Sequence, residues 1–195
     1  MPDVCLIFEV HQPLRLNRNF RADMLARPMV KKNDLFDLYF DHDLNRHVFE
    51  RAARKCYFPA NSIILEQIDH FKREWKQFKV TYSLTGVFVE QCERWNPSLI
   101  ESFKQLAQTG CVEFLDETYY HSLSSLFGSD RSEFTEQIHM HQQLMKDLFD
   151  YEPRILVNTE CLYNNPIAHT AESLGYEAMI TEGVERVLGG RSPNY

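Results

Sequence analysis

Arg154-Ile-Leu-Val-Asn-Thr-Glu-Cys-Leu-Tyr-Asn-Asn165 joins a short apolar run to a cluster of polar side chains. The apolar run, Ile155 to Val157, predicts a buried strand, and Glu160 follows it closely. Parallel β/α folds carry their chemistry at the C-terminal ends of strands. A carboxylate at such a position can serve as a nucleophile, a general base or a metal ligand.

Outside this stretch, apolar strand-like runs alternate with longer helical segments. Strands are predicted at 4–10, 79–84, 111–115, 154–159 and 177–181. Apolar periodicity and end signals predict helices at 43–57, 62–78, 97–108, 132–149 and 166–174. This alternation indicates an α/β fold with a parallel sheet. The pattern alone does not separate a closed barrel from an open, doubly wound sheet.

The residues that follow the strands favour a barrel-like mouth. Polar or small residues come after each strand: His11, Gly86, Asp116, Glu160 and Glu182. Gathered at one rim, they would surround a carbohydrate-sized pocket. The irregular residues 12–40 are expected to form a loop over that mouth. Residues 186–195 contain no closing element, and five strands would leave a barrel edge unpaired, so we expect either an open sheet or part of a longer protein.

The composition of the chain limits the kinds of molecule that it is expected to bind. The 195 residues suit a single domain. With 28 acidic and 21 basic residues the net charge is −7, which disfavours nucleic acid and suits a neutral substrate. No apolar run approaches the roughly 18 residues of a membrane helix, and no basic segment precedes a signal core. We therefore expect a cytoplasmic protein without a membrane partner; the sequence leaves the oligomeric state open.

The five cysteines are odd in number and lack a Cys-x-x-Cys pair, which argues against a disulfide framework and a zinc knuckle. We expect small buried hydrophobic residues, with Cys161 of interest because it adjoins Glu160. His139 and His141 lie two apart on a predicted helix, so they point to different faces. His141 is predicted to be a core histidine, and no local set supplies the three convergent ligands of a zinc site.

Two further segments supply candidate site residues. In Phe8-Glu-Val-His-Gln-Pro13, His11 and Gln12 follow the first strand and can bind sugar hydroxyls, although His11 could also be structural or ligate a metal. Glu113 lies within a predicted strand, where a buried carboxylate needs a partner, which could be a substrate hydroxyl, a protein donor next to the substrate site, or an arginine. The residues that follow it at the mouth are Asp116, Glu117, Tyr119, Tyr120 and His121. Aromatic rings there suit the apolar face of a sugar, and carboxylates suit its hydroxyls.

Three segments together resemble glycoside hydrolase family 57. They are His-Gln-Pro at 11–13, Gly-Cys-Val-Glu at 110–113 with Tyr-Tyr-His at 119–121, and Asn-Thr-Glu-Cys-Leu-Tyr-Asn-Asn at 158–165. Their order and spacing match that family's first three conserved regions, across residues 5–183. The third segment is most similar to the α-amylase branch of the family.

The resemblance implies a retaining mechanism on a seven-stranded (β/α) barrel, so that this chain would form a partial (β/α)7 barrel of about five parallel strands. Glu160 matches the catalytic nucleophile. His11 matches a residue that contacts the sugar, and Glu113 and His121 match positions lining the same pocket. With Gln12 and Asp116 they make up the expected substrate-binding set. The implied partner is an α-glucan or maltooligosaccharide, such as starch or glycogen, and neither a metal nor an organic cofactor is expected.

The chain departs from the family pattern in two ways. Glu9 stands where many members have a histidine. The family's general acid/base is an Asp in a fourth region, followed by a fifth region and a helical domain, all C-terminal to the residues present here. Residues 1–195 are therefore expected to be the N-terminal portion of one barrel catalytic domain. Because a missing general acid costs on the order of 10²–10⁴ in rate, this portion alone should hydrolyse starch very slowly or not at all.

Three other functions remain open. A 4-α-glucanotransferase or branching enzyme would share the fold and the nucleophile. A metal-dependent polysaccharide deacetylase would need an Asp and two His around one metal, and the usual Asp-Asp after the first strand is missing. A non-catalytic glucan-binding protein is disfavoured because Glu160 is present.

Overall fold

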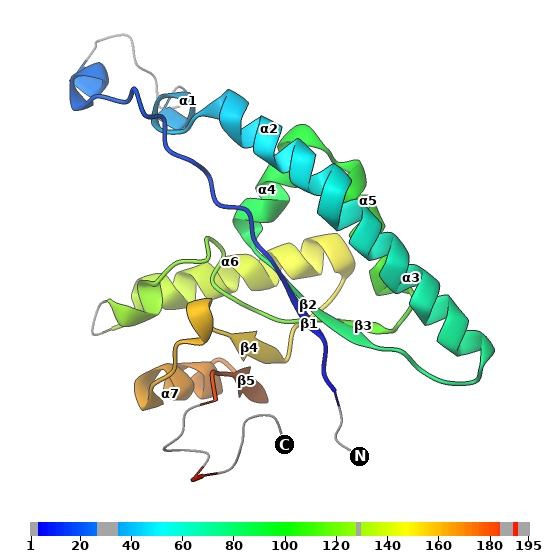
Figure 1. Cartoon of the computed structure of the whole chain (residues 1–195). Coiled ribbons are helices and arrows are strands. Elements are labelled where there is room, and N and C mark those ends of the chain that lie inside the picture. Colours follow the sequence, from blue (N-terminus) through cyan, green and yellow to red (C-terminus); the bar gives the residue numbers. More distant parts are fainter. Residues whose placement is uncertain (1–3, 27–34, 128–129, 184–188, 191–195) are drawn as a thin grey trace.

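The computed structural model describes residues 4–26, 35–127, 130–183 and 189–190. Five parallel strands alternate with helices (Figure 1). The strands are β1 (Ile7–Val10), β2 (Val80–Leu84), β3 (Val112–Phe114), β4 (Ile155–Val157) and β5 (Ala178–Ile180). All five predicted strands are confirmed, each shorter than its predicted range.

The order of the strands answers the question of architecture that the sequence left open. β1 pairs with β2, β2 with β3, and β4 with β5, always in parallel. A parallel bridge between Asp116 and Leu156 connects the two groups. There the Asp116 N–H donates to Ile155 O at 2.9 Å, and Val157 N–H donates to Asp116 O at 2.8 Å. Spatial order thus follows chain order without the reversal of a doubly wound sheet, and the fold is that of a partial (β/α) barrel.

The predicted helices are all present, with two differences. Those at the C-terminal side are α5 (Ser98–Gln108), α6 (Ser132–Phe149) and α7 (Asn165–Ser173). The first two predicted helices are one continuous rod made of α2 (His42–Ala52), the π-helical turn η3 (Ala53–Tyr57) and α3 (Phe58–Arg73). Pro59 is the second residue of α3, two residues after the π-helical turn ends at Tyr57. Such a turn accommodates a local break in the helical hydrogen-bond ladder.

Helix α4 (Gly86–Trp95) was not predicted. It starts immediately after β2, where Thr85 Oγ1 accepts a hydrogen bond from Phe88 N–H at 3.3 Å. A Cβ atom on Gly86 would overlap the Tyr119 ring, so this glycine permits a close approach of the chain. The missed signal was the N-cap threonine, a residue type favoured at helix starts.

The described part of residues 12–40 contains regular secondary structure, although a loop was expected there. They include the 3-10 turn η1 (Ala22–Ala26), the short helix α1 (Leu35–Tyr39) and an antiparallel bridge between Leu16 and Phe40. Residues 27–34 lie outside the described part, as does most of the predicted tail at 186–195. Within the described residues, no helix combines the length and apolarity needed to cross a membrane.

Two apolar clusters hold the strands in place. Residues such as Phe49, Phe88 and Phe103 pack helices α2–α5 against β1–β3, and Figure 1 shows these helices gathered on one side of those strands. Phe134, Leu156 and other apolar residues form the second cluster, between α6, β4 and α7. Both clusters pack helices against the strands. This packing fixes where the ends of the strands lie.

The cysteine prediction is only partly correct. All five cysteines are free, as expected, but only Cys92 is buried. Cys5 and Cys56 are exposed, while Cys111 and Cys161 are intermediate. Burial raises the pKa of the Cys161 thiol, with nearby carboxylates adding to the effect. That thiol is therefore poorly suited to act as a nucleophile.

Candidate functional site

His121 stands at the centre of a group of carboxylates at the C-terminal ends of the strands. Its Nδ1 lies 3.2 Å from Glu117 Oε2, and its Nε2 lies 3.3 Å from Glu9 Oε1 and 3.8 Å from Glu160 Oε1. The hydrogen bond with Glu117 raises the pKa of His121, burial opposes this, and the three negative charges add to the increase. We call Glu9, Glu117, His121 and Glu160 the carboxylate cluster.

His11 stacks on His121, with ring centroids 4.4 Å apart. Its Nδ1 lies 3.1 Å from Thr85 Oγ1, at the end of β2. Burial lowers the pKa of His11, and the neighbouring His121 lowers it further. The pKa values of the two rings are therefore shifted in opposite directions, and a proton binds to His121 in preference to His11.

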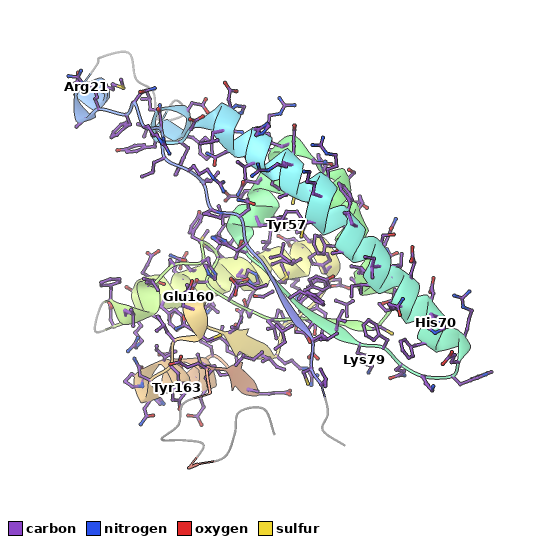
Figure 2. The ribbon with its side chains drawn as sticks, viewed as in Figure 1. Arg21, Tyr57, His70, Lys79, Glu160 and Tyr163 are labelled. Atoms are coloured by element: carbon purple, nitrogen blue, oxygen red, sulfur yellow. The ribbon has the colours of Figure 1, made fainter. Side chains whose placement is uncertain are left out.

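Glu160 belongs to the 3-10 turn η5 (Thr159–Cys161) that follows β4, where Figure 2 labels it. Its backbone is left-handed, with φ 58° and ψ 24°, a conformation that costs free energy in a residue other than glycine. Buried neighbours hold the turn: Asn158 Nδ2 donates to Ser125 Oγ and Leu162 O, both at 2.9 Å. The Glu160 side chain is 73% exposed, so a fixed backbone presents a carboxylate to an incoming ligand.

Glu117 is a member of the carboxylate cluster that the sequence analysis named at the mouth without assigning it a role. Its side chain is only 2% exposed, and Ser83 donates a 2.6 Å hydrogen bond to its Oε1. The other oxygen holds His121. The alternation of side chains along an extended segment could have indicated it, because Glu117 and Asp116 must point to opposite sides.

Asp116 does not reach the rim, which corrects its expected role in substrate binding. Its side chain is 0% exposed. One oxygen lies 2.5 Å from His141 Nδ1, and the other accepts from the Tyr176 hydroxyl. His141 Nε2 in turn lies 2.8 Å from Leu84 O, which confirms His141 as a core histidine. Burial opposes protonation of His141, but the hydrogen bond and charge of Asp116 outweigh it and raise the pKa.

Glu113 is likewise far from its expected place, because it lies at the start of the strands rather than at the rim. It pairs in register with Thr81, near the beginning of β2. Its Oε1 lies 3.6 Å from Arg154 Nη2. Of the partners that the sequence allowed, the structure provides the arginine.

Gln12 lies behind the rim and is largely buried. Its side chain sits between the Tyr57 hydroxyl, at 3.3 Å, and the Arg15 guanidinium. With its amide oxygen turned toward Arg15, it accepts from both terminal nitrogens at 3.1 Å. These contacts position the start of the loop, whereas a contact of Gln12 with substrate stays a prediction.

The described residues offer no group of three or more His, Cys, Asp or Glu side chains arranged to hold a metal ion. His11 and His121 stack face to face rather than aiming their nitrogens at one point. The arrangement instead combines an exposed carboxylate with an imidazole that favours its charged form. Such a pair suits attack on, or stabilisation of, an electrophilic carbon.

Fold and site together define a β/α-barrel protein with an exposed carboxylate at the C-terminal end of a strand. Comparison with known proteins identifies the family within this class. The glycosyl hydrolase family 57 model matches residues 5–195. A putative alpha-amylase from Methanocaldococcus jannaschii is 47% identical over 188 residues, covering 96% of this chain and 37% of the relative. The chain belongs to glycosyl hydrolase family 57.

Solved structures agree on the fold. A 4-alpha-glucanotransferase from Thermococcus litoralis matches with a TM-score of 0.68 at 18% identity, covering 97% of this chain and 24% of that one. An alpha-amylase from Thermotoga maritima matches with a TM-score of 0.57 at 14% identity, covering 90% and 38%. At these identities the likeness concerns the fold alone. The chain spans little more than a third of the curated relative's length.

Proposed function

We propose that this chain carries the nucleophile of a retaining glycoside hydrolase that acts on α-1,4-glucans, and that Glu160 is that nucleophile. The observation that carries the proposal is the exposed Glu160 carboxylate on a fixed turn, with Oε1 3.8 Å from His121 Nε2. Membership of the family and 47% identity to a putative alpha-amylase support it.

In the proposed reaction, a Glu160 oxygen attacks the anomeric carbon of a glucosyl unit. A glycosyl ester forms while the bond to the leaving glucan oxygen breaks, and that oxygen takes up a proton from a general acid. Water, deprotonated by the same group, then attacks the anomeric carbon and releases Glu160. His121 would orient Glu160, while Glu117 fixes the imidazole ring.

The family resemblance implies that the general acid/base is an Asp in a later conserved region. The proposal includes this residue. Retaining enzymes hold their two carboxyl groups about 5–5.5 Å apart. Residues 1–195 are accordingly proposed to be the N-terminal portion of the catalytic barrel. Without the proton donor, these residues alone should turn over glucan very slowly, because a glucosyl oxygen is a poor leaving group.

Trapping with a 2-fluoroglucosyl fluoride tests the nucleophile directly. Fluoride leaves without protonation, so labelling does not depend on the general acid. Intact mass should show one covalent adduct, peptide mapping should locate it on Glu160, and Glu160→Gln should abolish it. Glu172→Gln is a matched control, since its carboxylate is 83% exposed on α7 and its loss should change nothing. Absence of an adduct on the folded protein would contradict the proposal.

Product analysis separates the related activities. A longer family protein that contains this chain should convert maltoheptaose only to shorter oligomers if it is a hydrolase, whereas longer products would indicate a 4-α-glucanotransferase or branching enzyme. A stoichiometric divalent metal in the purified protein would instead favour a deacetylase. Glucan binding without any trapping would favour a non-catalytic binding protein.

A further inference from the structure

A buried hydrogen-bond network adjoins the carboxylate cluster, and the Asp116 side chain is its centre. Asp116 and His141 are both fully buried, and Asp116 Oδ1 lies 2.5 Å from His141 Nδ1. The same oxygen accepts a 3.0 Å hydrogen bond from the backbone N–H of Glu117. Glu117 belongs to the carboxylate cluster, so a single carboxylate oxygen connects the buried imidazole of His141 with that cluster.

Glu117 carries this connection on to His121. Its backbone N–H is held by Asp116, and its side chain lies between two further groups. Ser83 donates a 2.6 Å hydrogen bond to Oε1, and His121 Nδ1 lies 3.2 Å from Oε2. A shift of the Asp116 carboxylate would therefore move Glu117, and with it the partner that orients the His121 ring.

The backbone of Asp116 fixes the other side of the cluster. Its N–H donates to Ile155 O at 2.9 Å, and Val157 N–H donates to its carbonyl oxygen at 2.8 Å. Strand β4 ends at Val157, and Glu160 follows in the turn η5. Asp116 is thus connected to His121 through its side chain and to Glu160 through its backbone. The 3.8 Å separation of His121 Nε2 and Glu160 Oε1 depends on both connections.

His141 holds the Asp116 carboxylate from α6. Its Nε2 lies 2.8 Å from the carbonyl oxygen of Leu84, the last residue of β2, while its Nδ1 faces Asp116. Burial lowers the pKa of His141, but the hydrogen bond and charge of Asp116, the charge of Glu117 and the Leu84 carbonyl outweigh burial and raise it. The charged ring has an N–H on each nitrogen, so it can donate to the ends of two strands at once. Its charge also compensates for the neighbouring buried carboxylates, which would be costly to bury alone.

The second oxygen of Asp116 has separate partners. The Tyr176 hydroxyl donates to Oδ2, and Gln142 Nε2 donates to that hydroxyl at 2.8 Å. This contact does not involve Oδ1, the oxygen that faces His141 and accepts from Glu117. The two sides of one buried carboxylate can therefore be disturbed separately, one through His141 and the other through Tyr176.

We propose that His141 is a positioning residue for the carboxylate cluster. Through Asp116 it holds Glu117 in place, and Glu117 in turn fixes the His121 ring beside Glu160. His141 is fully buried and touches no substrate, so it acts only through these neighbours. Its effect on the labelling of Glu160 rests on the proposed function, whereas its effect on the contact between Glu117 and His121 does not.

Two amide substitutions separate the two contacts of His141. In His141→Asn the amide nitrogen comes close to the position of Nδ1, so a donor to Asp116 is kept and the donor to Leu84 O is lost. In His141→Gln the amide nitrogen comes close to the position of Nε2, so the donor to Leu84 O is kept and the one to Asp116 is lost. Each variant loses one contact and the charge, so the two are matched for a purely structural role.

The pKa of His121 is the measurement that distinguishes the variants. An NMR titration of the histidine ring signals in the whole chain measures it, and the His121 signal is assigned by its absence in His121→Asn. The hydrogen bond with Glu117 is the main cause of the raised pKa of His121. The pKa should therefore fall in His141→Gln, where Glu117 is held less firmly, and stay close to its original value in His141→Asn. The other titratable groups that face the ring are the same in both variants: Glu9, His11 and Glu160.

Tyr176→Phe is the matched control on the other side of the carboxylate, because it removes the contact with Asp116 Oδ2 and leaves both Oδ1 contacts. The pKa of His121 should not change in this variant. An unchanged pKa in folded His141→Gln, or an equal fall in His141→Gln and His141→Asn, overturns the inference. If His141→Gln does not fold, the double variant Asp116→Leu with His141→Leu provides the same test, because it leaves neither charge of the pair buried and also removes the acceptor for the Glu117 N–H.

Labelling with the fluoride reagent connects the inference with the reaction. The rate of Glu160 labelling should fall about tenfold in His141→Gln, as expected when one hydrogen bond to a charged group is lost, and should stay near the original rate in His141→Asn. Equal labelling rates in the two variants overturn the role of His141 in the reaction. Absence of labelling in the unsubstituted protein overturns the proposed function instead, and the pKa of His121 still decides whether His141 positions the cluster.

Discussion

Two of the histidine–carboxylate pairs, Asp116–His141 and Glu160–His121, differ mainly in burial. Asp116 and His141 are both 0% exposed and lie 2.5 Å apart, whereas His121 is 11% exposed and Glu160 73%, with 3.8 Å between them. In both pairs the neighbouring carboxylates favour the charged imidazole. The first pair joins β3 to α6 inside the protein and no substrate can reach it. The second pair leaves its carboxylate exposed, so a ligand can reach it.

The largest effect on stability is expected from the buried pair. Asp116→Ala leaves His141 buried without its partner, so the free energy of unfolding should fall by about 3–5 kcal/mol. Urea unfolding followed by circular dichroism measures this. Glu172→Ala, an exposed carboxylate on α7, should stay within about 0.5 kcal/mol of the unsubstituted protein. If Asp116→Ala and Glu172→Ala lose equally little free energy of unfolding, burial does not distinguish the two pairs.

Substitution of His121 should affect reactivity more than stability. His121→Asn keeps a donor and tolerates the left-handed backbone at φ 52°. We expect the rate of Glu160 labelling to fall about 10²-fold, since an oriented hydrogen-bonding group beside the reacting carboxylate is lost. The loss of unfolding free energy should be smaller than in Asp116→Ala. A normal labelling rate would show that His121 is only structural.

The pH dependence of labelling should report the His121 proton. The pKa of His121 is raised above 6.5, so the imidazolium persists past that pH and is lost as the pH rises through the raised value. The labelling rate should therefore hold through pH 6.5 and fall on the alkaline side. Glu117→Gln removes the main cause of the increase and should move that fall to lower pH. Glu113→Gln, whose carboxylate pairs with Arg154, should leave it where it was.

The smallest effect is expected from Glu9. Its carboxylate lies 3.3 Å from His121 Nε2 but is 52% exposed, so solvent screens the interaction. Glu9→Gln should change the labelling rate about two- to threefold, as expected for the loss of an exposed ion pair. A change as large as that in His121→Asn would mean that Glu9 has a direct part in the reaction, and would place this chain's departure from the family pattern at the centre of its chemistry.

Local patterns were enough for the five strands, for the helices that were predicted and for the position of Glu160 after β4. The apolar run Ile155–Val157 is a strand, and Glu160 follows it at the rim, as its position in the sequence predicted. Helix α4 was missed because it starts directly on the strand end, where Gly86 was interpreted as a rim residue. Glu113 and Asp116 were misplaced because spacing along the chain does not say which end or face of a strand a side chain occupies.

The sequence by itself determined the α/β class, the five strands, the family and the identity of the exposed carboxylate, since each depends on residue types within a short segment. Only the tertiary structure decided the strand order, the burial of Asp116 against His141, and the meeting of Glu9, Glu117 and Glu160 around His121. A pocket beside His121 likewise combines residues from α1, α4 and the segment after β3. The physical reason is that burial and electrostatic coupling depend on distances in space between residues far apart in the chain.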